Sequence, residues 1–124
     1  MSIQKNKSCA VLVRPRLYIG DSISIGPGKI DLLRAVGEAR SIAAAARSLG
    51  TPYKRAWLLI DALNEGFGRP VVETATGGKG GGGASLTTLG QELVVAYDAL
   101  EKRLNVEAAS ELAALRKLAD DSHS

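Results

Sequence analysis

The sequence predicts a mainly α-helical fold with a small β-hairpin and a long C-terminal helix. Two short helical patterns joined by a tight turn lie between residues 41 and 64, and a glycine-rich run then separates two strand-like segments. A longer pattern, with apolar residues recurring every three or four positions, continues from Leu89 to Ala119. With a strand region and one more helix at the start, this order is that of a winged helix-turn-helix domain.

Length and composition favour one domain. The chain has 124 residues, of which 45% are apolar and only 4% aromatic, and these values suit a single core of closely packed helices. We expect one domain over residues 1–124. It divides into an N-terminal strand region (1–28), the helix-turn-helix and wing (29–87) and a C-terminal helical dimerisation region (88–124).

The apolar runs of the sequence are short. The longest one near the N-terminus, Cys9 to Val13, is ended by Arg14-Pro15-Arg16, whereas a membrane span needs about 20 apolar residues and a secretory signal a longer run than this. We therefore expect a cytoplasmic protein without a membrane partner.

The first elements precede the helix-turn-helix. Between Val11 and Ile25 the chain is rich in β-branched and apolar residues, which predicts one or two short strands. Gly26-Pro27-Gly28 then predicts a break in the chain between the strand region and the next helix. The apolar spacing from Lys29 to Glu38 predicts a helix with one buried stripe. That stripe consists of Ile30, Leu33 and Val36, with Leu32 and Ala35 alongside.

The first helix of the helix-turn-helix is expected over Ile42–Leu49. Ser41 has a side-chain oxygen that can cap its start, and Gly50 suits the left-handed conformation of its C-cap. Ala46 is the small residue that a close crossing of the two helices requires. Gly50 follows it by four positions, at the place of the turn.

The second helix is expected over Tyr53–Asn64. Thr51 is its expected cap, and Pro52 its first residue, where no amide hydrogen bond is lost. Ala56 and Leu59 occupy its inner face. An ordinary helical hairpin remains the alternative for the whole motif, because Ala, Gly and Leu are common residues.

The outer face of this second helix carries the candidate chemistry. Tyr53, Lys54 and Arg55 lie near its N-terminus, where a recognition helix meets base edges and phosphates. Tyr53 is expected to face DNA, whereas Trp57 is interpreted as a packing residue. Solvated positions are favoured over phosphate contacts for three further bases, Arg14, Arg16 and Arg47.

The glycine-rich run has three interpretations. Gly66 to Pro70 is expected to be a turn, Val71 to Thr76 a strand, and Ala84 to Thr87 the strand that pairs with it. A phosphate-binding P-loop is excluded because Gly80 follows Lys79, where Ser or Thr is needed. A dinucleotide fingerprint lacks its acidic partner at a strand end. The wing of a winged helix fits best, with Lys79 reaching phosphate at the hairpin tip.

The last helical region is expected to begin at a Thr88 cap and to have a break at Asn105. A helix this long, at about 1.5 Å per residue, projects beyond a small domain. Its apolar stripe is therefore expected to pair with a second chain. The stripe consists of Leu89, Leu93, Tyr97, Leu100, Leu104, Ala108, Leu112, Leu115 and Ala119.

Charge and reactive residues narrow the function. Four bases and no acid lie between Ala39 and Ile60, whereas seven acids and four bases lie between Gln91 and Asp121. A basic middle suits contact with an anionic polymer, although two ordinary solvated faces fit as well. Cys9 and His123 are the only residues of their kinds. They leave no internal disulfide, no Cys-rich metal site and no Ser-His or Cys-His catalysis, so no enzyme is expected.

A family resemblance rests on three segments. Tyr53-Lys54-Arg55-Ala56-Trp57 stands upstream of the string A-T-G-G-K-G-G-G-G-A-S-L-T at residues 75–87, and Gly90-Gln91 follows. Over roughly Lys29 to Arg103 the sequence resembles the N-terminal domain of ModE-type, molybdate-responsive transcription regulators. The resemblance implies a winged-helix homodimer that binds a palindromic operator. It also implies molybdate-binding domains, which we do not expect in this sequence of 124 residues ending at Ser124.

These observations predict a regulator that binds double-stranded DNA as a homodimer at an inverted repeat. No cofactor and no metal are expected in this chain, and molybdate is expected only if a partner senses it. The alternative is a protein-interaction module that pairs through its C-terminal helix with a full-length regulator and does not bind DNA. The expected DNA-binding residues are Ser41, Thr51, Pro52, Tyr53, Lys54, Arg55, Lys79 and Gly80.

Overall fold

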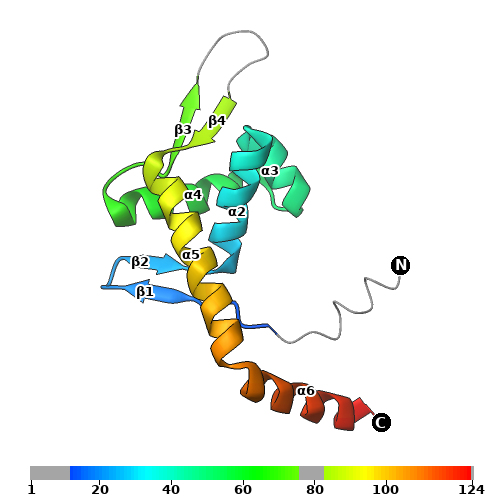
Figure 1. The fold of residues 1–124 in the computed structure, drawn as a ribbon. Coiled ribbons are helices and arrows are strands. Elements are labelled where there is room, and N and C mark those ends of the chain that lie inside the picture. Colours follow the sequence, from blue (N-terminus) through cyan, green and yellow to red (C-terminus); the bar gives the residue numbers. More distant parts are fainter. Residues whose placement is uncertain (1–11, 76–82, 124) are drawn as a thin grey trace. The chain divides into compact units, whose positions relative to one another are not determined.

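The computed structural model describes residues 12–75 and 83–123, so the predicted wing-tip residues Lys79 and Gly80 lie outside the described residues. The chain forms two compact units. The larger is Pro15–Tyr97, and the smaller combines residues 12–14 with those from Asp98 onward. The predicted mainly α-helical winged fold is confirmed, with one wing hairpin and a helical C-terminal region (Figure 1).

The larger unit begins with a β-hairpin, in which β1 (Leu17–Ile19) pairs antiparallel with β2 (Ile23–Ile25). Leu17 lies opposite Ile25 and Ile19 opposite Ile23. The turn between them includes Gly20, whose φ of 61° is in the left-handed region that glycine adopts without strain. The strand region predicted from the sequence is thus two strands.

Helix α2 (Pro27–Ala39) starts earlier than expected. The Gly26-Pro27-Gly28 segment was expected to interrupt the chain, but only Gly26 stands outside the helix, as its N-cap. Proline is accepted at the first helical position because its fixed φ is helical and its missing N–H has no partner there anyway. The predicted stripe is confirmed, since Ile30, Leu33 and Val36 are fully buried.

Helix α3 (Ile42–Leu49) has its predicted bounds, whereas α4 (Tyr53–Phe67) runs three residues beyond its expected end at Asn64. Gly66 lies inside α4 rather than in a turn. A Cβ there would approach the Ile23 side chain to 2.9 Å and the Ser22 carbonyl oxygen to 3.1 Å. The glycine therefore allows the β1–β2 hairpin to pack on the end of α4. Gly68 ends the helix with a φ of 70°.

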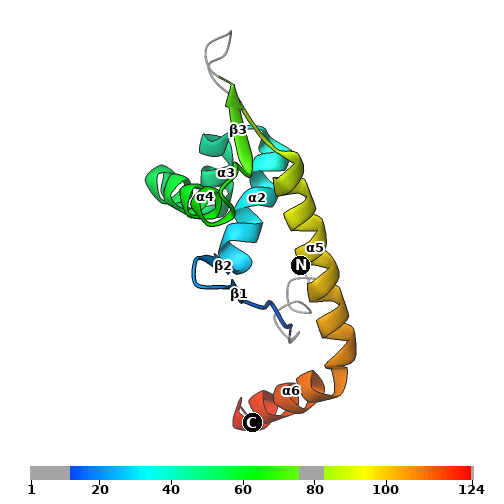
Figure 2. The ribbon, with the colours of Figure 1, turned by 90° about the vertical axis from the view of Figure 1, so that its left-hand side faces the viewer.

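The wing hairpin consists of β3 (Val72–Ala75) and β4 (Gly83–Leu86), with Val72 opposite Leu86 and Ala75 opposite Gly83. Its base is tied to the helices, because the Ala84 N–H donates to the carbonyl of Arg40 at the end of α2, at 3.0 Å. The β1–β2 and β3–β4 hairpins lie at opposite ends of α2 (Figures 1 and 2).

Helix α5 (Thr88–Glu107) begins at a cap one residue before the expected one. The Thr87 hydroxyl accepts a hydrogen bond from the Gly90 N–H at 3.1 Å and donates to the Pro70 carbonyl at 2.9 Å. Thr88 is therefore the first residue of the helix. Thr87 also links this start to the loop before the wing.

The interruption of the C-terminal helical region lies at Ala108, not at the predicted Asn105, and α6 (Ala109–His123) follows it. Asn105 has another role in the smaller unit. Its Oδ1 accepts from the Val13 N–H at 2.8 Å, and its Nδ2 donates to the Val13 carbonyl at 3.0 Å. The Asn105 side chain thus pairs with both the N–H and the carbonyl of Val13.

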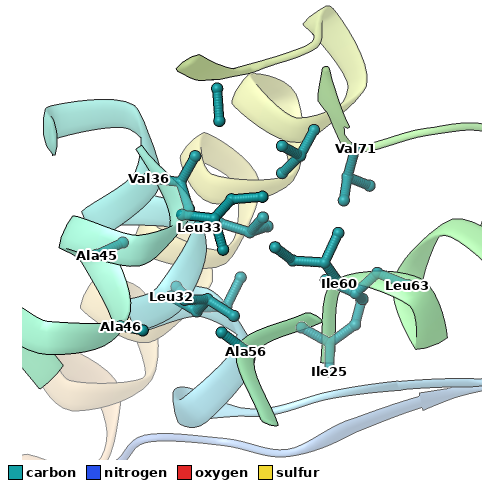
Figure 3. Packing of buried hydrophobic residues seen from close by; sticks show 14 of the residues in the cluster. Ile25, Leu32, Leu33, Val36, Ala45, Ala46, Ala56, Ile60, Leu63 and Val71 are labelled. Atoms are coloured by element: carbon teal, nitrogen blue, oxygen red, sulfur yellow. The ribbon is translucent and has the colours of Figure 1, made fainter. Parts of the chain in front are cut away.

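The core of the larger unit lies between α2, α3, α4, β2 and the wing. Figure 3 shows Leu33 and Val36 of α2, Ile60 of α4 and Val71 converging on its centre. Among the residues that the structure describes, no polar or charged residue is buried. In the same part of the chain, no helix combines the length and the apolar character that a membrane crossing needs.

We predict that Gly90→Ala destabilises the protein by roughly 1–3 kcal/mol. A Cβ at Gly90 would collide with the backbone carbonyl of Val71, which cannot move without displacing the start of the wing. Urea denaturation measures the effect. Gly28→Ala is the control, because nothing lies within 4 Å of its added Cβ. Equal stability of the two variants would contradict the predicted collision.

We predict that Asn105→Ala speeds hydrogen exchange at the Val13 amide by roughly tenfold, as expected for the loss of one to two hydrogen bonds. Amide exchange followed by mass spectrometry or NMR measures this protection. Ser110→Ala, an exposed change in the same unit, should leave the Val13 amide protected. Unchanged exchange in Asn105→Ala would show that this side chain does not hold the segment.

Candidate nucleic-acid interface

The turn between α3 and α4 is held by backbone hydrogen bonds. Gly50, with φ 66° and ψ 28°, ends α3 in the predicted left-handed conformation, and its N–H donates to the Arg47 carbonyl at 3.1 Å. The Thr51 N–H donates to the Ala46 carbonyl at 2.9 Å. Ala46 on α3 and Ala56 on α4 are both buried on the core sides of their helices (Figure 3).

Ser41 caps α3 as predicted. Its Oγ accepts a hydrogen bond from the Ala44 N–H at 3.1 Å. The Ser41 hydroxyl, one of the predicted DNA contacts, thus accepts a hydrogen bond within the protein. Its first role in the structure is to fix the start of α3.

The start of α4 differs from the prediction. Pro52 is the N-cap rather than the first helical residue, with φ −59° and ψ 142°, and no side chain caps the helix. The expected Thr51 cap is wrong because Thr51 lies one position too early in the chain to reach these amides. The first N–H groups of α4 are therefore left to an outside acceptor, and a helix N-terminus favours an anion.

Helix α4 presents distinct faces because successive residues turn by about 100°. Ala56, Ile60 and Leu63 are buried and define its inner face. Lys54 and Leu58 point the opposite way and are exposed. Tyr53 lies with Trp57 on one flank, and Arg55 lies with Leu59 on the other.

The Tyr53 flank faces the wing. The Tyr53 and Trp57 rings meet edge to face, with centroids 6.4 Å apart and planes at 84°. Trp57 is half-buried against the core, as its interpretation as a packing residue requires, whereas 54% of Tyr53 is exposed. A groove of about 320 Å³ joins this flank to the start of α3 and the base of the wing. Its lining includes Ser41, Tyr53, Trp57, Thr74 and Gly83.

The charge on this surface is unbalanced. Arg40, Arg47, Lys54 and Arg55 are all exposed, and none of them forms an ion pair with a carboxylate of the described residues. In the same part of the chain, no cluster of His, Cys, Asp or Glu could hold a metal ion. The arrangement can bind an anionic polymer along α4.

Leu58 was missed by the sequence interpretation. It is 56% exposed and stands at the centre of the outer face of α4, between the two flanks. Its position opposite Ala56 and Ile60 in the helical pattern was the signal that could have identified it. An exposed leucine at this place suits apolar contact with a thymine methyl group.

The comparisons with known proteins agree with this geometry. The family model of the bacterial regulatory helix-turn-helix proteins of the lysR family matches residues 28–91. That match includes α2 to α4, the wing and the start of α5.

Similar proteins include the molybdenum-pterin-binding protein MopB of Rhodobacter capsulatus, at 48% identity over 62% of this chain and 28% of the relative. The DNA-binding transcriptional dual regulator ModE of Escherichia coli is 46% identical over 68% of this chain and 32% of the relative. The transcriptional regulator ModE of Haemophilus influenzae is 40% identical over 77% of this chain and 37% of the relative. The predicted resemblance to ModE-type regulators is confirmed, and the chain spans about a third of the length of these relatives.

We predict that Ser41→Ala lowers the free energy of unfolding by about 1 kcal/mol, because α3 loses its side-chain cap. Ser41→Asp should retain the stability, since aspartate accepts the same hydrogen bond from the Ala44 amide. Thermal and urea denaturation of both variants measure the difference. Equal stability of Ser41→Ala and the wild type would refute the capping role.

Proposed function

Since the chain belongs to the bacterial regulatory helix-turn-helix proteins of the lysR family, we propose that it is a transcription regulator that binds an inverted repeat in double-stranded DNA as a homodimer. The observation that carries the proposal is the start of α4. It combines uncapped backbone amides with the exposed cations Lys54 and Arg55, beside a groove that leads to the wing.

In this proposal α4 is the recognition helix and enters the major groove. Lys54 and Leu58 on its outer face meet base edges, where lysine binds guanine acceptors and leucine contacts thymine methyl groups. Tyr53 and Thr51 add polar contacts at the helix start, and Arg55 binds phosphate on its own flank.

The wing and the cap residues position this helix. Ser41 orients α3, and Pro52 sets the direction in which α4 leaves the turn. Lys79 and Gly80 are proposed to contact the sugar-phosphate backbone at the minor groove, where a lysine charge and a bare backbone both reach phosphate.

The homodimer is proposed to form through the smaller unit. The first part of the predicted stripe does not face a second chain, because Tyr97 is buried in the core of the larger unit and Leu89 and Leu93 pack against it. In the smaller unit, Leu115 of the stripe is 56% exposed, together with Val106 at 67% and Leu118 at 62%. Leu115 and Leu118 lie three positions apart on α6, and an exposed apolar patch marks an interaction surface. A second copy of the chain would cover them and place two recognition helices about 34 Å apart, one turn of DNA.

Two of the similar proteins are named molybdenum-pterin-binding proteins, and this binding is a property of those relatives. For this chain we infer that any response to molybdate comes through a partner protein that senses it. No cofactor site in the chain itself is part of the proposal.

The decisive experiment is selection of bound duplexes from a random DNA library by the full chain, followed by sequencing. We expect an inverted repeat with half-site centres about 34 Å apart, bound at least ~1,000-fold more tightly than a scrambled duplex. Lys54→Ala combined with Arg55→Ala should abolish that preference. Arg69→Ala is the matched control, since Arg69 is exposed just beyond the other end of α4.

Absence of any enriched sequence, in a chain that is folded and soluble, would contradict the proposal. An interaction module that pairs through its C-terminal helices is the function that such a result would favour. Pull-down with a full-length ModE-type regulator would then test that alternative.

A further inference from the structure

A second hollow lies on the flank of α4 that faces away from the wing groove. It measures about 260 Å³ and lies within the larger unit. Three cationic residues line it from three parts of the chain: Arg16 just before β1, Lys29 in the first turn of α2, and Arg55 in the first turn of α4. Thr51 adds a hydroxyl group, and no acidic residue belongs to the lining.

These three charges are held together without a balancing carboxylate. No ion pair of the described residues includes Arg16, Lys29 or Arg55. Burial lowers the pKa of Lys29, and the positive charge of Arg16 lowers it further. An anion in the hollow would relieve this repulsion between like charges.

The positions of Arg16 and Lys29 are set by the backbone around them. Lys29 Nζ donates to the Ser24 carbonyl at 2.6 Å, at the end of the β1–β2 hairpin. The Arg16 guanidinium packs against Gly26, where a Cβ would stand 3.0 Å from the Arg16 Cζ. Glycine at this N-cap therefore leaves room for the guanidinium beside the start of α2.

The start of α2 adds backbone donors to the same place. Its N-cap, Gly26, has no side chain to accept a hydrogen bond, and Pro27 has no N–H. The amides of Gly28 and Lys29, both lining residues, are therefore uncapped by any side chain. Cationic side chains together with helix N-terminal amides are the groups that bind phosphate in proteins.

We propose that this hollow binds a phosphate group of the DNA backbone, with Arg16 and Lys29 as contact residues in addition to Arg55. The inference rests on the proposed function and extends it to residues outside the helix-turn-helix. DNA is the favoured source because Arg55 and Thr51 belong both to the hollow and to the start of the recognition helix. The hollow and the wing groove lie on opposite flanks of α4, so the two contact places bracket the inserted helix.

The test is the salt dependence of DNA binding by Arg16→Gln and Lys29→Gln, measured by fluorescence anisotropy. Each variant should bind the selected and the scrambled duplex roughly tenfold more weakly near 0.1 M salt, because one counterion-releasing contact is lost. The slope of log K against log [salt] should become shallower by about 1, and the preference between the duplexes should not change. Lys29→Gln retains a donor for the Ser24 carbonyl, so its fold should not be affected.

Arg69→Gln is the matched control, because it removes one exposed positive charge outside the hollow. If Arg16→Gln and Lys29→Gln show the same affinity and salt slope as this control, the inference is overturned and the proposed function stays intact. A wild-type chain that binds neither duplex would overturn both.

A second measurement separates DNA phosphate from the free anion. Melting temperatures are recorded with and without inorganic phosphate at constant ionic strength. Phosphate could raise the melting temperature of the wild type but not of Arg16→Gln, while both proteins bind DNA equally. In that case the hollow binds a free anion, and the assignment of the bound phosphate to the DNA backbone is wrong.

Discussion

The close packing of α3 against α2 and α4 is the constraint on which the rest of the larger unit depends. Ala45, Ala46 and Ala56 are buried to 2% exposure or less, and their small side chains let the helix backbones approach one another. A larger residue at any of them would push the packed helices apart. The direction of α4 sets both of its flanks, so this packing determines where the wing groove and the cationic hollow lie.

The start of α4, which belongs to the proposed DNA-binding surface, leaves its first backbone amides without a side-chain cap. Two of the described helices begin with a capping side chain, Ser41 for α3 and Thr87 for α5. The first turn of α4 has no side-chain cap and carries two adjacent cations instead. Unpaired donors and unbalanced charges of this kind are costly in a monomer and favourable beside a phosphate chain.

The sequence predicted the element order and the inner faces of the helices because burial follows helical periodicity, which is a local property. The predicted helix bounds were less accurate where a residue typical of turns also fits a helix. Gly66 and Pro27 are typical of turns, yet both lie in helices, one because a hairpin packs on it and the other because proline suits a first helical turn. The cap expected at Thr88 lies at its neighbour Thr87, since two adjacent threonines offer the same hydroxyl group. The cap expected at Thr51 has no counterpart, because Pro52 is the N-cap of α4 and no side chain caps that helix.

The sequence by itself determined that this chain forms a winged helix-turn-helix whose second helix begins with two basic residues, because spacing, capping residues and the Tyr53–Trp57 and glycine-rich motifs are all readable along the chain. Only the tertiary structure decided which residues meet. It placed Arg16 and Lys29 beside Arg55, although 39 positions separate Arg16 from Arg55 in the sequence. It also placed Asn105 against Val13 rather than at a helix break. Long-range contacts of this kind depend on how helices and hairpins pack, and no local pattern encodes them.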